Sequence, residues 1–183
     1  MTTAFGIAAV TGVLQSLIHE EIKEAELQSR LGISAPDVTA LPLHSAVEKA
    51  GNALNVFMYR TGVNSGWRNR QLPERDRAGE RISNPPLPLD LHYMLTAIGE
   101  ENFVADALLG KGMQLLHQYG TLPRDLIRAT LTDQMLHGDR KKKFAEFVDS
   151  GIADQIEGIK LTPHFPDDDE LSKIWSSVQA EMH

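Results

Sequence analysis

An alternating run in the middle of the chain, "PLPLDLHYMLTAIG" at residues 86–99, most narrows what this sequence can fold into. Successive side chains of an extended chain point to opposite faces, so one face would carry the leucines and the other Asp90 and His92. A helix would spread the same leucines around its circumference, and Pro86 and Pro88 suit a strand entry better than a helix interior. The run therefore predicts a strand.

Other segments predict further strands and helices around this one. The sequence after Thr3 has the spacing of an amphipathic helix that ends near Gly32. A central strand is predicted in "NALNVFMYRTG", where large side chains alternate on both faces, and shorter strands in "DVTALPL" and "DQIEGIKLTP". The predicted buried stripe of the first helix is Ile7, Val10, Leu14, Leu17, Ile18, Ile22 and Ala25.

Three more helices complete the predicted order. One spans about 102–119, with Gly110 and Gly112 allowing close approach to a neighbour, and a second lies within "TLPRDLIRATLTDQML". The last follows Asp167 or Asp168, either of which can cap its first turn. This order predicts an α+β fold with a mainly antiparallel sheet flanked by helices, in a single domain over residues 1–183.

Charge and composition limit the classes of function. The 183 residues carry a formal net charge of −7 and contain no cysteine, so disulfides and thiolate metal ligands are excluded. An acidic chain does not wrap nucleic acid or anionic lipid with its whole surface, because that affinity rests on Lys and Arg. The first residues lack the basic region and cleavage site of a signal peptide, and no apolar stretch is long enough to span a membrane. We therefore expect the protein to be in the cytoplasm while it assembles.

Residues 63–84 differ from the rest, because they are rich in arginine and show almost no periodicity. About twenty residues without regular structure are uncommon in a compact domain and are usually functional or disordered. We interpret this segment as an extended arm that forms an interface, since an aromatic anchor with planar cations is typical of interfaces. A mobile polar loop is the plain alternative. The predicted interface residues are Tyr59, Arg60, Trp67, Arg68, Asn69, Arg70 and Arg75.

Two other functions compete with an interface. Asp90 and His92 share a predicted strand face, so a small α+β hydrolase could use them, but no serine stands in a nucleophile motif. The arm's arginines and Trp67 would also suit a groove for single-stranded nucleic acid. "HEEIK" lacks the second histidine of a metalloprotease helix, because position 23 is lysine. We therefore predict no catalytic residue, no metal and no cofactor.

Four segments, in order, show a resemblance that covers nearly the whole chain. They are "NVFMYRTGVNSGWRNRQLPERD", "NPPLPLDLHYMLTAIG", "LLGKGMQLLHQYGTLPRDLIRATL" and "IEGIKLTPHFPDDDELSKIWSSVQ". Together they resemble the tail-terminator, or cap, proteins of extracellular contractile injection systems, the phage-tail-like particles of antifeeding-prophage and virulence-cassette type. The strand with Asp90 and His92 lies within the resemblance, which favours a structural role for both residues.

The resemblance implies a phage tail-terminator-like fold and a structural protein rather than an enzyme. Such a protein forms a ring, expected to be hexameric, that terminates the inner tube and contacts the last sheath layer. The implied partners are further copies of the chain, the inner-tube protein and the sheath protein, without nucleic acid or membrane. The chain would become part of a particle that can be released. The family continues past its last helix into an extended segment, whereas this sequence stops at "SSVQAEMH", as expected of a shortened member.

Overall fold

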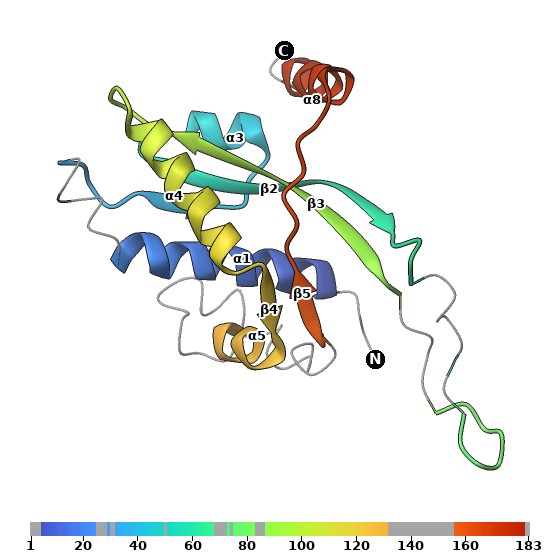
Figure 1. Cartoon of the computed structure of the whole chain (residues 1–183). Helices are drawn as coiled ribbons and strands as arrows, with labels where there is room; N and C mark the ends of the chain where they lie inside the picture. Colours follow the sequence, from blue (N-terminus) through green and yellow to red (C-terminus); the bar gives the residue numbers. More distant parts are fainter. Residues whose placement is uncertain are drawn as a thin grey trace. The chain divides into compact units, whose positions relative to one another are not determined.

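The computed structural model of the chain describes residues 5–24, 29, 32–49, 51–67, 73, 75–82, 87–131 and 156–181. Its helices are α1 (Gly6–Glu24), α3 (Leu43–Glu48), α4 (Val104–Gln118), α5 (Arg124–Leu131) and α8 (Asp168–Glu181). Its strands are β1 (Asp37–Thr39), β2 (Ala53–Val63), β3 (Leu89–Ile98), β4 (Thr121–Pro123) and β5 (Gly158–Lys160). This combination of helices with two small sheets (Figure 1) confirms the predicted α+β class.

The first sheet has the order β1-β2-β3, and β4 and β5 form a second sheet. β1 runs parallel to β2, with Thr39 opposite Asn55, whereas β3 runs in the opposite direction to β2 (Figure 1). β4 and β5 are antiparallel, with Leu122 opposite Ile159. The prediction that β2 is a central strand is therefore confirmed. β3 forms an edge of its sheet, and its residues are half-buried from Leu91 onward without alternation between the faces.

The chain divides into two compact units, which we call the body and the arm unit. The body consists of Met1–Phe57 and Leu95–His183, and the arm unit of Met58–Met94. β2 and β3 each continue from one unit into the other. The predicted arm at 63–84 falls inside the arm unit, and a single domain over 1–183 stays a prediction.

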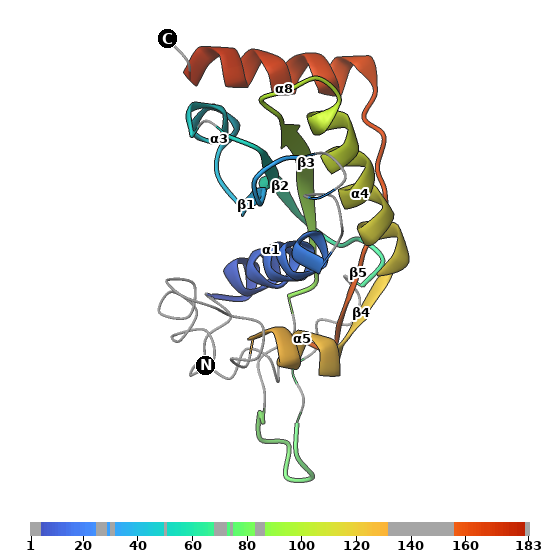
Figure 2. The ribbon, with the colours of Figure 1, turned by 90° about the vertical axis from the view of Figure 1, so that its left-hand side faces the viewer.

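The hydrophobic core of the body forms around α1, which contacts β1, α4 and α5 (Figure 2). Leu14, Leu17, Ile18 and Ile22 of the predicted stripe are buried, whereas Ile7 and Val10 are only half-buried. Thr3 and Ala25 lie outside the described residues. Apolar side chains from the other elements complete the core: Val38, Leu54, Val56, Val104, Leu108, Leu115, Leu122, Ile127 and Leu131. Burying these groups removes apolar surface from water and is the main stabilising term.

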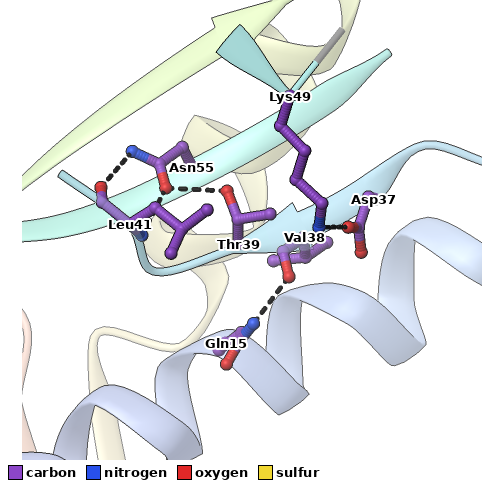
Figure 3. A network of polar contacts seen from close by, with 7 residues as sticks. All are labelled: Gln15, Asp37, Val38, Thr39, Leu41, Lys49 and Asn55. Carbon is purple, nitrogen blue, oxygen red and sulfur yellow. Dashed lines mark hydrogen bonds and ion pairs between the residues drawn. The ribbon is translucent and has the colours of Figure 1, made fainter. Parts of the chain in front are cut away.

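A polar network fixes the short strand β1 against its neighbours (Figure 3). The Asn55 side chain is fully buried, and its Oδ1 accepts hydrogen bonds from Thr39 Oγ1 (2.7 Å) and the Leu41 backbone N–H (2.9 Å). Its Nδ2 donates to the Leu41 carbonyl oxygen (3.0 Å), so the amide pairs with Leu41 as a backbone peptide would. Gln15 Nε2 donates to the Val38 carbonyl oxygen (2.6 Å), and Lys49 pairs with Asp37 (2.7 Å).

The strand prediction for "DVTALPL" is wrong beyond Thr39, because α3 begins at Leu43 after Pro42. Two parallel strands cannot be joined by a tight hairpin and need a crossover connection, which α3 provides between β1 and β2. A second correction concerns "TLPRDLIRATLTDQML", whose first three residues form β4 before α5 starts at Arg124. These three residues pair with β5, and the low helix propensity of threonine and proline agrees with a helix that starts only after them.

The helix predicted over 102–119 is confirmed as α4, and the two glycines inside it differ. A Cβ on Gly112 would lie 2.7 Å from Leu54 Cδ2 and 3.1 Å from Leu95 Cδ2, so the predicted close approach is real at this position. A Cβ on Gly110 would have no heavy atom within 4 Å, so the prediction is wrong there. α4 packs on the sheet through Gly112.

The last helix, α8, begins as predicted at the acidic run. Asp167 Oδ1 accepts a hydrogen bond from the Glu170 backbone N–H (2.8 Å), which identifies Asp167 as the capping residue. Asp168, Asp169 and Glu170 fill the first turn, where negative charge is favoured by the helix dipole. Among the helices that the structure describes, none combines the length and the apolar character that a membrane span requires.

Candidate interface on the arm unit

The arm unit differs from the body in the sign of its charge. Between Met58 and Met94 the sequence has six arginines, no lysine and four carboxylates, which gives a formal charge of +2. The remaining residues contain twelve basic and twenty-one acidic side chains, a formal charge of −9. Positive charge is therefore concentrated in about a fifth of the chain, and there it is carried by guanidinium groups alone. Guanidinium groups bind carboxylates through paired, directional hydrogen bonds.

His92 contacts both an aromatic ring and a guanidinium group within the arm unit. The rings of Tyr59 and His92 meet edge to face, with centroids 6.0 Å apart and planes inclined by 61°. Arg60 Nη2 lies 3.3 Å from both ring nitrogens of His92. Two of the predicted interface residues, Tyr59 and Arg60, thus hold β2 against β3 through His92.

Asn64 forms the junction where β2 ends. Its backbone N–H donates to the Pro88 carbonyl oxygen (3.1 Å), and its Nδ2 donates to Asp90 Oδ1 (2.8 Å). Its Oδ1 accepts from the Trp67 backbone N–H (3.1 Å), which closes a turn. The carboxylate of Asp90 therefore accepts a hydrogen bond from Asn64, and Trp67 in the turn is 54% exposed.

The tip of the arm unit is a short loop between Arg75 and Arg81, which form an isolated antiparallel bridge. Asp76 organises this loop, because its Oδ1 accepts from the backbone N–H groups of Ala78 (2.9 Å) and Glu80 (2.8 Å). Gly79 has φ +86°, a conformation that glycine adopts most easily, and its carbonyl oxygen accepts from Arg75 Nη1 (2.8 Å). These contacts give the tip a defined shape.

The described side chains of the arm unit form no core of their own, since none of them is buried. Several large apolar groups are exposed there instead, namely Val63, Trp67, Ile82, Leu87 and Leu89. Arginine beside exposed aromatic and aliphatic side chains is the composition of protein interfaces rather than of ordinary surface. The arrangement therefore suits recognition of a partner with acidic and apolar groups.

The predicted interface residues fall into two groups. Tyr59, Arg60, Trp67 and Arg75 lie in the arm unit as described above, whereas Arg68, Asn69 and Arg70 lie outside the described residues. Sequence reasoning missed Asn64 and Asp76, which fix the junction and the tip. The available signal was the preference of Asn and Asp for turns in which the side chain bonds to nearby backbone.

Asp90 and His92 are not brought together as a catalytic pair. Asp90 accepts from Asn64, and His92 contacts Tyr59 and Arg60. Within the part of the chain that the structure describes, no three histidine or carboxylate side chains gather in a way that could hold a metal ion. The lack of an enzymatic activity and of a cofactor stays a prediction.

The fold and the arm unit define a small α+β protein with an arginine-rich surface of interface type. The Pvc16 N-terminal domain family matches residues 9–183, so the chain belongs to this family, whose members are components of contractile injection systems. This agrees with the resemblance found in the sequence. No curated protein matches the chain.

Proposed function

We propose that this chain is the structural cap of a contractile injection system. It forms a homo-oligomeric ring, sixfold as the resemblance implies, that terminates the inner tube and contacts the last layer of the sheath. The observation that carries the proposal is the family match over residues 9–183. The proposed partners are further copies of the chain, the inner-tube protein and the sheath protein, and the chain has no catalytic residue.

Two features of the structure support this proposal. The arm unit exposes arginine and large apolar groups together, as subunit contacts do. β3 is an edge strand, and edge strands carry backbone groups that can pair with another chain. A cap must bind the growing end of a tube on one side and leave no template for another subunit on the other. We also propose that assembly takes place in the cytoplasm and that the cap leaves as part of the particle.

The test is tube growth in the presence of the chain. Purified inner-tube protein is polymerised with and without it, and tube lengths are measured in negative-stain micrographs. We expect a narrower length distribution and a ring at one end of each tube. Tubes of unchanged, uncontrolled length would contradict the proposal.

A variant of the arm tests whether this segment carries the assembly contacts. Arg68→Glu combined with Arg70→Glu should leave the chain folded but abolish ring formation or tube capping. Far-UV circular dichroism and the melting temperature should stay near wild type, because the sequence predicts both arginines in an exposed arm, where substitutions usually shift stability by about 0.5 kcal/mol or less. A gel shift at low salt addresses the nucleic-acid alternative, and salt-dependent binding would favour it.

A further inference from the structure

α8 carries an exposed stripe that combines acidic and apolar groups. Asp168, Leu171 and Trp175 are spaced by three and four residues, so they share one face of the helix. Asp168 is exposed, Leu171 is 41% exposed and Trp175 is 52% exposed. We call these three residues the α8 stripe. Ile174 is half-buried, and α8 contacts α3 in the body (Figure 2). An exposed leucine and tryptophan one turn apart form a typical recognition surface.

The carboxylates at the start of α8 differ in what they contact. Asp167 caps the helix, Asp169 pairs with Lys173 (2.7 Å), and Glu170 pairs with His164 (2.9 Å). Asp168 makes no hydrogen bond or ion pair with any residue that the structure describes. The one carboxylate of the run that has no local role is therefore the one on the α8 stripe.

Arg77, at the tip of the arm unit, is the basic counterpart of Asp168. It is exposed, and it lies in the loop that the Asp76 carboxylate organises. Within the described ranges of the chain, its guanidinium group has no hydrogen-bonding or ionic partner. Ile82, directly after the Arg75–Arg81 bridge, is 66% exposed and adds an apolar group beside the charged tip. A loop whose shape is already fixed loses less entropy on binding than a flexible one.

We propose that the arm tip of one copy docks on the α8 stripe of a second copy, with Arg77 paired to Asp168. Ile82, the exposed apolar residue that follows the tip loop, then covers Leu171 and Trp175. Charge complementarity identifies a second copy as the partner, because one chain carries both a +2 arm unit and a body of −9 whose longest acidic run begins α8. This inference rests on the proposed ring, and it names the surfaces that form it.

The two surfaces lie on different parts of the chain, so the contact is head to tail. Such heterologous contacts close into a ring when the rotation between neighbours divides a full turn. Each copy in the ring then uses its own arm tip once and its own α8 stripe once. A self-complementary dimer, in contrast, would pair the same surface with itself.

The test uses charge reversal in the full-length chain. Arg77→Glu and Asp168→Lys each place like charges in contact, so self-association should weaken about tenfold or more when measured by sedimentation velocity. An equimolar mixture of the two variants should associate again, because every contact in an alternating ring is then either Arg77 with Asp168 or the reversed pair. The double variant in one chain should also associate.

A matched control separates this contact from general effects of charge. Asp106→Lys changes the net charge equally, and Asp106 is an exposed residue in the first turn of α4, as Asp168 is in α8. This variant should associate like the wild type. Recovery in the mixture also shows that both single variants are folded.

Failure of the inference differs from failure of the proposed function. Variants that associate and cap tubes like the wild type would overturn the docking contact and leave the cap proposal intact. Weakening that is not rescued by mixing would also overturn the contact, as would a wild-type chain that stays monomeric alone and on tubes. A chain that associates as predicted but leaves tube length unchanged would instead contradict the cap.

Discussion

At the scale of single residues, Asn55 shows how a polar group becomes part of a core. Asparagine is seldom fully buried, because an unpaired amide loses its hydrogen bonds with water. Here both ends of the amide are satisfied, two bonds being accepted from Thr39 and Leu41 and one donated to Leu41. The sequence predicted a central strand around Asn55 but could not identify this role, because Leu41 lies fourteen residues earlier in the chain.

Asn55→Asp tests the network through its pH dependence. At neutral pH the carboxylate cannot donate to the Leu41 carbonyl oxygen, and a buried unpaired charge destabilises the fold by about 3–5 kcal/mol. A protonated carboxyl group has the shape of the amide and can donate, so the folded state raises the pKa of this group above its unfolded value. Stability relative to wild type should therefore be greatest below about pH 4, the ordinary range for aspartate, and fall as pH rises.

Asn55→Leu is the control for this prediction. It removes the same three hydrogen bonds but introduces no titratable group, so its loss of stability relative to wild type should not change with pH. Urea unfolding of both variants at several pH values gives the comparison. A parallel pH response of the two variants would show that the Leu41 carbonyl oxygen has no need of the Asn55 donor.

The residues of the candidate interface show the same limit of sequence reasoning. Asp90 and His92 were placed correctly in one strand, but their contacts come from residues 26 and 32 positions away, Asn64 and Arg60. Alternation along a strand says which residues share a face and nothing about the neighbouring strand. The composition of the arm was visible from the sequence, whereas the bonds that shape its junction and tip were not.

At the scale of elements, the two that the sequence did not predict, α3 and β4, are both short, although the three-residue strand β5 was predicted in "DQIEGIKLTP". α1, α4, α8, β2 and β3 are long enough to repeat an apolar pattern several times, and all five were predicted. α3, with six residues, and β4, with three, are too short to show a period. Both depend on distant partners: α3 on the parallel pairing of β1 with β2, and β4 on its pairing with β5.

The packing of α4 gives a prediction with an internal control. Gly112→Ala places a methyl group 2.7 Å from Leu54 Cδ2, and Leu54 is fully buried and has little room to move. We expect a loss of about 1–3 kcal/mol in the free energy of unfolding. Gly110→Ala meets no atom within 4 Å and should gain about 0.5–1 kcal/mol from the higher helix propensity of alanine.

Urea or thermal unfolding measures both glycine variants. The two substitutions are identical in chemistry and lie two residues apart in one helix, so a common effect on helix propensity cancels in their difference. Equal stabilities would mean that Leu54 and Leu95 can repack around the added methyl group, and that Gly112 is not needed for the approach of α4 to the sheet.

At the scale of the whole molecule, the uneven distribution of charge and burial separates the two units. The buried hydrophobic side chains that the structure describes all lie in the body, and none lies in the arm unit. A segment without buried side chains adds little hydrophobic stabilisation, so it is expected to open locally at low free energy. In an assembly, contacts with other subunits would then add to the hydrogen bonds that shape the arm tip.

This separation predicts the outcome of replacing Met58–Met94 with a short turn that contains Asn-Gly, the sequence favoured in tight hairpins. A shorter connection lowers the entropic cost of closing the loop by on the order of 2 kcal/mol. This gain offsets part of the stability that is lost with the strand pairs of the arm unit. We expect a folded monomer with a melting temperature near that of the full chain and no ring formation. An unfolded product would show that the arm unit stabilises the body.

Hydrogen exchange on the full chain gives the complementary measurement. In the separate subunit, the described amides of the arm unit should exchange faster than those of α1 and α4, because opening them exposes no core. In the assembled ring, protection should rise in the loop between Arg75 and Arg81, which the proposed contact covers. Equal protection of these amides in the subunit and in the ring would mean that assembly leaves the arm free, and ring formation would then have to be attributed to other surfaces, such as the edge strand β3.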